Sequence, residues 1–107
     1  MVLIKVKYFS RVRELLDLKE EQYEVVDGTS VMDILTKLIP ERHPEVSKSW
    51  TRHLFLTIGD EVAFDKDGTP ILSNYVALVN AEPRSLEYWL EDGDEIAILL
   101  PIGGGQN

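Results

Sequence analysis

The chain has 107 residues, a formal net charge of −8 at pH 7 and no cysteine. One domain is expected at this length. The missing cysteines exclude disulfides, thiolate catalysis and cysteine-based metal sites. The acidic charge argues against nucleic-acid binding, which needs clustered Lys and Arg, and suits a basic partner surface. No apolar run approaches the about 20 residues of a membrane span, and the start lacks signal-peptide features. We therefore expect a cytoplasmic protein without membrane or nucleic-acid partners.

The first elements follow from alternation of apolar and polar residues. Val2 to Phe9 is expected to form a strand, with every second residue from Val2 facing inward. Ser10 is placed to cap a short helix. A second strand is expected over Gln22 to Val26, ended by a turn at Asp27-Gly28.

The clearest helical signal begins at Ser30. Ser30 and Asp33 have the spacing of a capping box, in which two side chains satisfy the first backbone N–H groups of a helix. We expect Pro40 and Pro44 to end the helix. One apolar stripe at helical spacing would pack against a sheet, and it consists of Val31, Ile34, Leu35 and Leu38.

The second half of the chain predicts short strands. His43 to Arg52 reads as irregular, followed by strand candidates at Leu54 to Ile58 and Glu61 to Phe64 and by a loop at Asp65 to Pro70. Tyr75 to Val79 is expected to be a strand.

A turn is expected at Asn80 to Pro83, and Ser85 is placed to cap a single helical turn. A tight turn at Asp92-Gly93-Asp94 then leads into a last strand, Glu95 to Leu100, which is apolar on both faces.

These elements predict an α+β fold. One main helix against a mixed sheet of four or five strands is the economical packing for segments this short. The first and last strands are the most apolar, so we place them side by side and parallel at the centre. This arrangement is a β-grasp, the ubiquitin-like fold.

A short glycine tail follows the last strand. Pro101 has no N–H and cannot extend the sheet, and Ile102 leads into Gly103, Gly104 and Gly105. A tail without side chains can enter a narrow channel and present a terminal carboxylate to a distant active site. A frayed end or a linker has the same composition. We therefore expect a domain at residues 1–102 and a tail at residues 103–107.

Three blocks of sequence carry a family resemblance. The chain resembles the ubiquitin-like sulfur carriers of the molybdopterin synthase small-subunit (MoaD) and ThiS families, and the related small archaeal modifier proteins. The resemblance covers nearly the whole chain, with a longer middle from Arg42 to Asn74. The matching blocks are Ile4 to Phe9 with Arg13-Glu14-Leu15, Val76 to Asn80, and Leu90 to Ala97 leading to Pro101-Ile102-Gly103-Gly104-Gly105.

The resemblance implies a carrier that is not itself an enzyme. Gly104-Gly105 would be its di-glycine end. An adenylating enzyme, similar to ubiquitin-activating enzymes, would activate the Gly105 carboxylate with ATP, and a sulfur donor would displace AMP to leave a thiocarboxylate. ATP and a metal would be bound by that enzyme, and this chain would hold no cofactor, no metal and no catalytic residue. The expected acceptor is a pterin precursor on the molybdopterin synthase large subunit, with a thiazole precursor or a tRNA uridine as alternatives.

Two residues follow the di-glycine. While Gln106 and Asn107 remain, the Gly105 carbonyl belongs to an amide and cannot attack ATP. We expect a protease to remove both residues.

A partner-binding face is expected on the open side of the sheet. Alternation places Phe9 and Leu99 opposite the side assigned to the helix, and exposed apolar residues on a sheet face mark binding patches. The resemblance adds Pro83 to this contact. Pro101 and Ile102, which lead into the tail, are also expected to bind the partner. Coverage of the patch by the long middle segment is the alternative.

Two other functions fit the same residues. One is a protein modifier joined to target lysines through Gly105. The other is a β-grasp interaction module whose tail stays blocked by Gln106 and Asn107.

Overall fold

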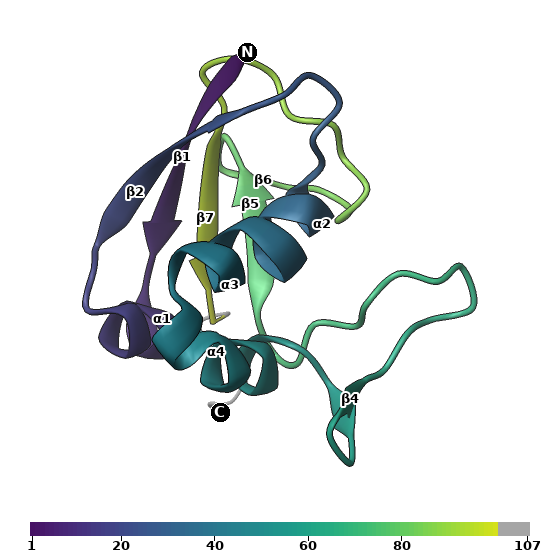
Figure 1. Ribbon diagram of the computed structural model, residues 1–107. Coiled ribbons are helices and arrows are strands. Elements are labelled where there is room, and N and C mark those ends of the chain that lie inside the picture. Colours follow the sequence, from purple (N-terminus) through teal and green to yellow (C-terminus); the bar gives the residue numbers. More distant parts are fainter. Residues whose placement is uncertain (101–107) are drawn as a thin grey trace.

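The computed structural model describes residues 1–100, and a five-stranded mixed sheet is its centre (Figure 1). β1 and β7 are parallel neighbours, and the other neighbouring strands are antiparallel. The predicted β-grasp and its central parallel pair are confirmed. The strands, in spatial order, are β2 (Glu20–Val25), β1 (Val2–Tyr8), β7 (Glu95–Leu99), β5 (Val76–Val79) and β6 (Glu82–Pro83).

The main helix crosses one face of the sheet in three continuous pieces, α2 (Val31–Asp33), the π-helical η1 (Ile34–Leu38) and α3 (Ile39–Arg42). The predicted capping box is present. The Ser30 hydroxyl accepts from the Asp33 N–H at 3.1 Å, and Asp33 Oδ2 accepts from the Ser30 N–H at 3.1 Å.

Pro40 does not end the helix, contrary to the prediction, and lies inside α3. The preceding π-helical piece explains this. The Ile39 N–H donates to the Ile34 carbonyl five residues back, which widens the turn before the proline ring. A proline in a regular helix clashes with the carbonyl four residues back, so the wider turn removes the reason for a break. The helix ends at Arg42, just before Pro44.

The segment predicted to be irregular is helical and extends the helical layer that covers the sheet. η2 (Pro44–Val46) leads into α4 (Ser47–Leu54), which overturns both the irregular prediction and the strand start at Leu54. Trp50 is completely buried and its indole N–H donates to the Leu35 carbonyl at 2.9 Å. The Trp50 ring meets the Tyr8 ring edge-on at a centroid distance of 6.1 Å. Trp50 and Leu54 lie one helical turn apart, which was the available sequence signal.

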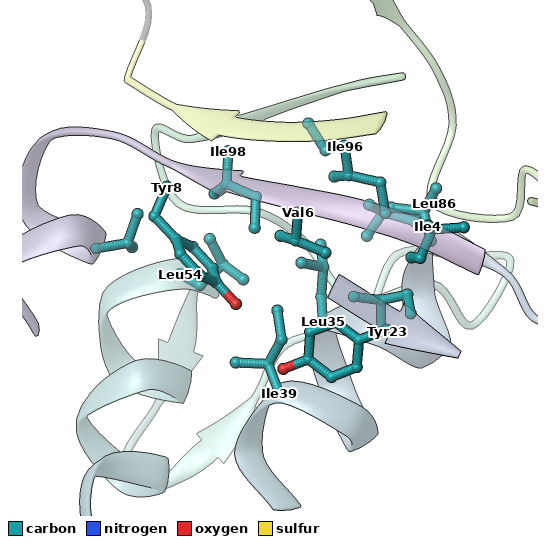
Figure 2. Close-up of a cluster of buried hydrophobic side chains, with 14 of the residues drawn as sticks. Ile4, Val6, Tyr8, Tyr23, Leu35, Ile39, Leu54, Leu86, Ile96 and Ile98 are labelled. Carbon is teal, nitrogen blue, oxygen red and sulfur yellow. The ribbon is translucent and has the colours of Figure 1, made fainter. Parts of the chain in front are cut away.

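The core lies between this helical layer and the sheet. Figure 2 shows Ile4, Val6 and Tyr8 of β1 beside Ile96 and Ile98 of β7, on the side where the helices lie. All five are almost fully buried. The helical side chains that meet them include Leu35, Ile39 and Leu54. Burying such side chains is the dominant favourable contribution to folding.

Three smaller predictions need correction. Ser10 does not cap α1 (Ser10–Leu16); Phe9 stands at the cap position without a side-chain bond, and Ser10 has a left-handed φ of 57°. β2 begins at Glu20, ahead of the expected Gln22. Ser85 caps a tight turn rather than a helical turn, since its hydroxyl accepts from the Glu87 N–H at 3.0 Å.

The remaining strands form a separate hairpin, β3 (Thr57–Ile58) with β4 (Glu61–Val62), which is shorter than the two strands expected there. The loop from Asp65 to Pro70 is present as predicted. Within residues 1–100, no helix has both the length and the apolar character required to cross a bilayer.

Glu21, near the start of β2, has several polar partners at the border of the core. Its carboxylate accepts from the Tyr8 hydroxyl at 2.7 Å and the Tyr23 hydroxyl at 3.2 Å, and His43 Nε2 lies 2.9 Å from Oε1. Arg42 Nη1 lies 3.6 Å from Oε2. Burial acts to raise the pKa of Glu21, but the hydrogen bonds with His43 and Tyr8 outweigh it and lower that pKa. Burial also raises the pKa of Tyr23 to about 12.

The contacts of Glu21 predict that part of the unfolding free energy is lost at acidic pH. A carboxyl group whose pKa is lowered on folding stabilises the fold above its unfolded pKa, about 4.3 for glutamate, and that contribution is lost as the pH falls further. The unfolding free energy from urea titrations should therefore decrease steeply below about pH 4.3. Glu21→Gln should flatten this dependence, whereas Glu24→Gln, on an exposed position of the same strand, should leave the shape of the curve unchanged. Equal curves for the Glu21 variant and the parent would contradict the assignment.

Candidate functional site

The open face of the sheet carries an apolar patch. We define the apolar patch as Phe9, Val76, Leu78, Pro83, Ala97 and Leu99, all of them partly or well exposed. The strand register gathers its members, because Leu78 lies opposite both Ala97 and Pro83, and Val76 lies opposite Leu99. Three of them, Phe9, Pro83 and Leu99, come from the sequence prediction. Val76, Leu78 and Ala97 were missed, although strand alternation alone could have found them.

Phe9 continues β1 beside Leu99. Its N–H donates to the Ile98 carbonyl at 3.2 Å, and its backbone is extended. Arg13 fixes this corner, because its Nε donates to the Tyr8 carbonyl at 3.0 Å and its guanidinium lies 5.4 Å from the centre of the Phe9 ring. The Tyr8-Phe9 and Arg13 blocks of the sequence thus meet at one edge of the patch.

Charged side chains border the patch. Lys7 lies opposite Ala97 and pairs with Glu95 at 3.3 Å, and Lys5 pairs with Glu20 at 3.7 Å. An apolar centre with a charged rim is the usual anatomy of a protein-binding surface. The middle segment packs through Trp50 on the helical side, so Phe9 and Leu99 remain partly exposed.

The Asp92-Gly93-Asp94 turn anchors β7 to its neighbours. Asp92 Oδ1 accepts from the Leu3 N–H at 2.8 Å, and the Gly93 N–H donates to the Leu3 carbonyl at 2.8 Å. Gly93 has a φ of +88°, a conformation that side chains disfavour. Both turn residues therefore hold the start of β1 against the start of β7.

Asp94 is buried and fully engaged. Its Oδ1 accepts from the Asn80 amide at 2.8 Å and its Oδ2 accepts from the Glu91 N–H at 2.8 Å. Asn80 Oδ1 in turn accepts from the Glu95 N–H at 3.1 Å. The acidic turn is therefore structural, and it sets the position from which β7 runs towards the C-terminus.

The tail prediction falls beyond this point. Pro101, Ile102, the three glycines from Gly103 to Gly105, Gln106 and Asn107 lie outside the described residues. Their assignment stays a prediction. The structure does place Leu100, the last described residue, at the end of the central strand next to the apolar patch.

Comparison with known proteins agrees with this architecture. The sequence matches the model of the ThiS family over residues 6–105. It is 30% identical over 105 residues to a molybdopterin synthase sulfur carrier subunit of Chlamydomonas reinhardtii, covering 95% of this chain and 98% of the relative.

Two solved structures share the fold over nearly their whole length. A putative molybdopterin converting factor subunit 1 of Pyrococcus furiosus is 27% identical with a TM-score of 0.66, covering 95% of this chain and 100% of that one. The small archaeal modifier protein 1 of Methanosarcina acetivorans is 28% identical with a TM-score of 0.62, covering 98% of each chain.

Asp94 provides a test of how firmly β7 is anchored. Asp94→Ala should lower the unfolding free energy by about 2–4 kcal/mol, because it leaves the Glu91 N–H and the Asn80 amide without their buried acceptor. Asp92→Ala removes one exposed acceptor and should cost about 1 kcal/mol or less. Urea denaturation measures both. A loss for Asp94→Ala no larger than that for Asp92→Ala would contradict the anchoring role.

Proposed function

Because this chain belongs to the ThiS family of small sulfur carriers, we propose that it carries sulfur as a thiocarboxylate on Gly105. In the first step, a Gly105 carboxylate oxygen attacks the α-phosphorus of ATP, and pyrophosphate leaves. In the second step, a hydrosulfide ion (HS⁻) delivered by the sulfur donor attacks the acyl carbon of the adenylate, AMP leaves, and loss of the S–H proton gives the thiocarboxylate. The adenylating partner binds the ATP and its metal, and the carrier contributes the carboxylate and its positioning.

The observation that supports this proposal is that the end of β7, from which the tail begins, is held in a fixed position. β7 is hydrogen-bonded on both sides, to β1 and to β5, and the Asp94 network holds its start. The position and the direction of the C-terminal end of β7 are therefore fixed by the sheet. Residues 101–105 reach about 17 Å when extended, at roughly 3.3–3.6 Å each. A partner docked on the apolar patch would meet the tail beside its point of contact.

Processing of the C-terminus comes before this chemistry. We propose that a protease removes Gln106 and Asn107, because Gly105 has no free carboxylate while Gln106 is attached to it.

The processing step predicts which forms can be charged. Chains ending at Gly105, at Gln106 and at Asn107 should be compared with the adenylating enzyme of the same organism. Only the chain ending at Gly105 should support ATP-dependent pyrophosphate release, because only that chain presents the glycine carboxylate. With a sulfur donor present, its intact mass should show one oxygen exchanged for sulfur. Charging of the chain that still ends at Asn107 would sink the processing hypothesis.

The apolar patch is the proposed docking surface for the adenylating enzyme. Leu99→Asp should raise the KM for the carrier about tenfold or more, with the kcat changed little, because it places a charge in the centre of the contact. Leu3→Asp is the matched control, since Leu3 is a well-exposed leucine on the same sheet face near the opposite end of β1. Equal KM values for the two variants would argue against the patch.

A molybdopterin precursor is the proposed sulfur acceptor, with the molybdopterin synthase large subunit as the second partner. The name of the Chlamydomonas reinhardtii relative supports this choice, since that protein is a molybdopterin synthase subunit. Converting a pterin precursor to molybdopterin with the thiocarboxylated chain and the large subunit would test it directly.

A second function is favoured by one observation. The Methanosarcina acetivorans structure is named a small archaeal modifier protein, at 28% identity. If this chain acts in the same way, Gly105 would be joined to lysines of target proteins. Target peptides with Gly105 linked to a lysine ε-amine, seen by mass spectrometry of cell extracts, would support modification. Detection of the Gly105 thiocarboxylate without any lysine-linked peptides would support the sulfur-carrier function.

A further inference from the structure

A second surface feature lies at the root of the tail, on the side away from the apolar patch. It is an open pocket of about 440 Å³. Arg11 of α1 and Arg52 and His53 of α4 contribute to its wall, together with Tyr75 just before β5 and Leu100 just after β7. We call it the basic pocket. Segments far apart in the sequence converge here, which is why neither composition nor periodicity indicates it.

The basic pocket contrasts with the charge of the whole chain. The protein has 19 acidic and 11 basic residues, so a place where basic side chains gather is unusual on its surface. Within residues 1–100, Arg11 forms no ion pair with a carboxylate. Arg52 pairs at 3.2 Å with Asp60, but both side chains are well exposed, and such pairs are weak in water. The guanidinium groups are therefore available to an incoming anion.

Tyr75 supports the proximity of these groups. Burial raises the pKa of its hydroxyl, and the nearby positive charge of Arg11 opposes that rise. Glu14 lies beside Arg11 and His53 in an adjoining hollow, so one carboxylate of the chain borders the site.

The place of the pocket suggests what fills it. Leu99 belongs to the apolar patch, whereas Leu100 lines the basic pocket, so the two features meet at the end of β7. A protein that surrounds the tail would cover both. The exposed guanidinium groups would hold a free anion only weakly in water, but a partner that excludes water makes the same charges much more effective.

We propose that the basic pocket receives a carboxylate side chain of the adenylating enzyme, at the entrance of the channel that takes up the tail. This inference rests on the proposed function and adds a charged contact to the apolar one. Such a contact would fix the angle at which the carrier docks and would speed encounter of the two proteins.

The test uses the carrier ending at Gly105 and its adenylating enzyme. Arg11→Glu should raise the KM for the carrier about fivefold or more and weaken its dependence on salt, because it reverses one charge at a contact. Arg11→Lys should stay within about twofold of the parent, since it keeps the charge. Lys66→Glu, an equal charge change on the Asp65 to Pro70 loop, is the matched control and should leave KM and salt dependence unchanged.

The outcomes separate the two proposals. If the parent chain is never adenylated, the proposed function fails. If the parent is adenylated and Arg11→Glu behaves like Lys66→Glu, only the carboxylate contact is overturned. A second experiment tests whether the basic pocket binds phosphate instead of a protein carboxylate. Inorganic phosphate is added to the carrier alone, and binding is monitored by the NMR shifts of Arg11, His53 and Tyr75. Saturable binding at physiological salt would identify a phosphate site and overturn the protein-carboxylate assignment, and weak, non-saturating shifts are expected.

Discussion

The parallel pairing of the first and last strands is the constraint on which this structure depends. Two strands from opposite ends of the sequence lie side by side at the centre of the sheet, so this one pairing brings the two ends of the described chain together. The Asp92-Gly93-Asp94 turn fixes that pairing through bonds to Leu3, Asn80 and Glu91. Because the pairing sets the register of β7, it also sets the apolar patch on one side and the core on the other.

Residues with a strong local signal were predictable. The alternation of Val2 to Tyr8 indicated β1, and the Ser30–Asp33 capping box indicated the main helix, because in both cases local preference and burial act in the same direction. The parallel centre followed from the apolar character of both strands. On the candidate site, Phe9 and Leu99 could be placed on the open face by the same alternation.

Tertiary interactions decided the rest. Pro40 is tolerated inside a helix because the π-helical turn before it makes room for the proline ring. Sequence rules for helix ends do not predict such a turn. α4 was missed because its polar residues conceal an apolar stripe, and Trp50 is stabilised by a carbonyl of another helix. The basic pocket escaped prediction for a related reason, since Arg11 and Arg52 meet only after α1 and α4 have packed.

The double pairing of β7 also has a mechanical consequence. A partner that draws the tail into a channel pulls along the axis of this strand. The hydrogen bonds to β1 and β5 run across that axis, so the pull shears all of them together instead of opening them one by one. β7, to which the tail is attached, therefore resists being pulled out of the sheet. The pulling force is shared among the hydrogen bonds on both of its sides.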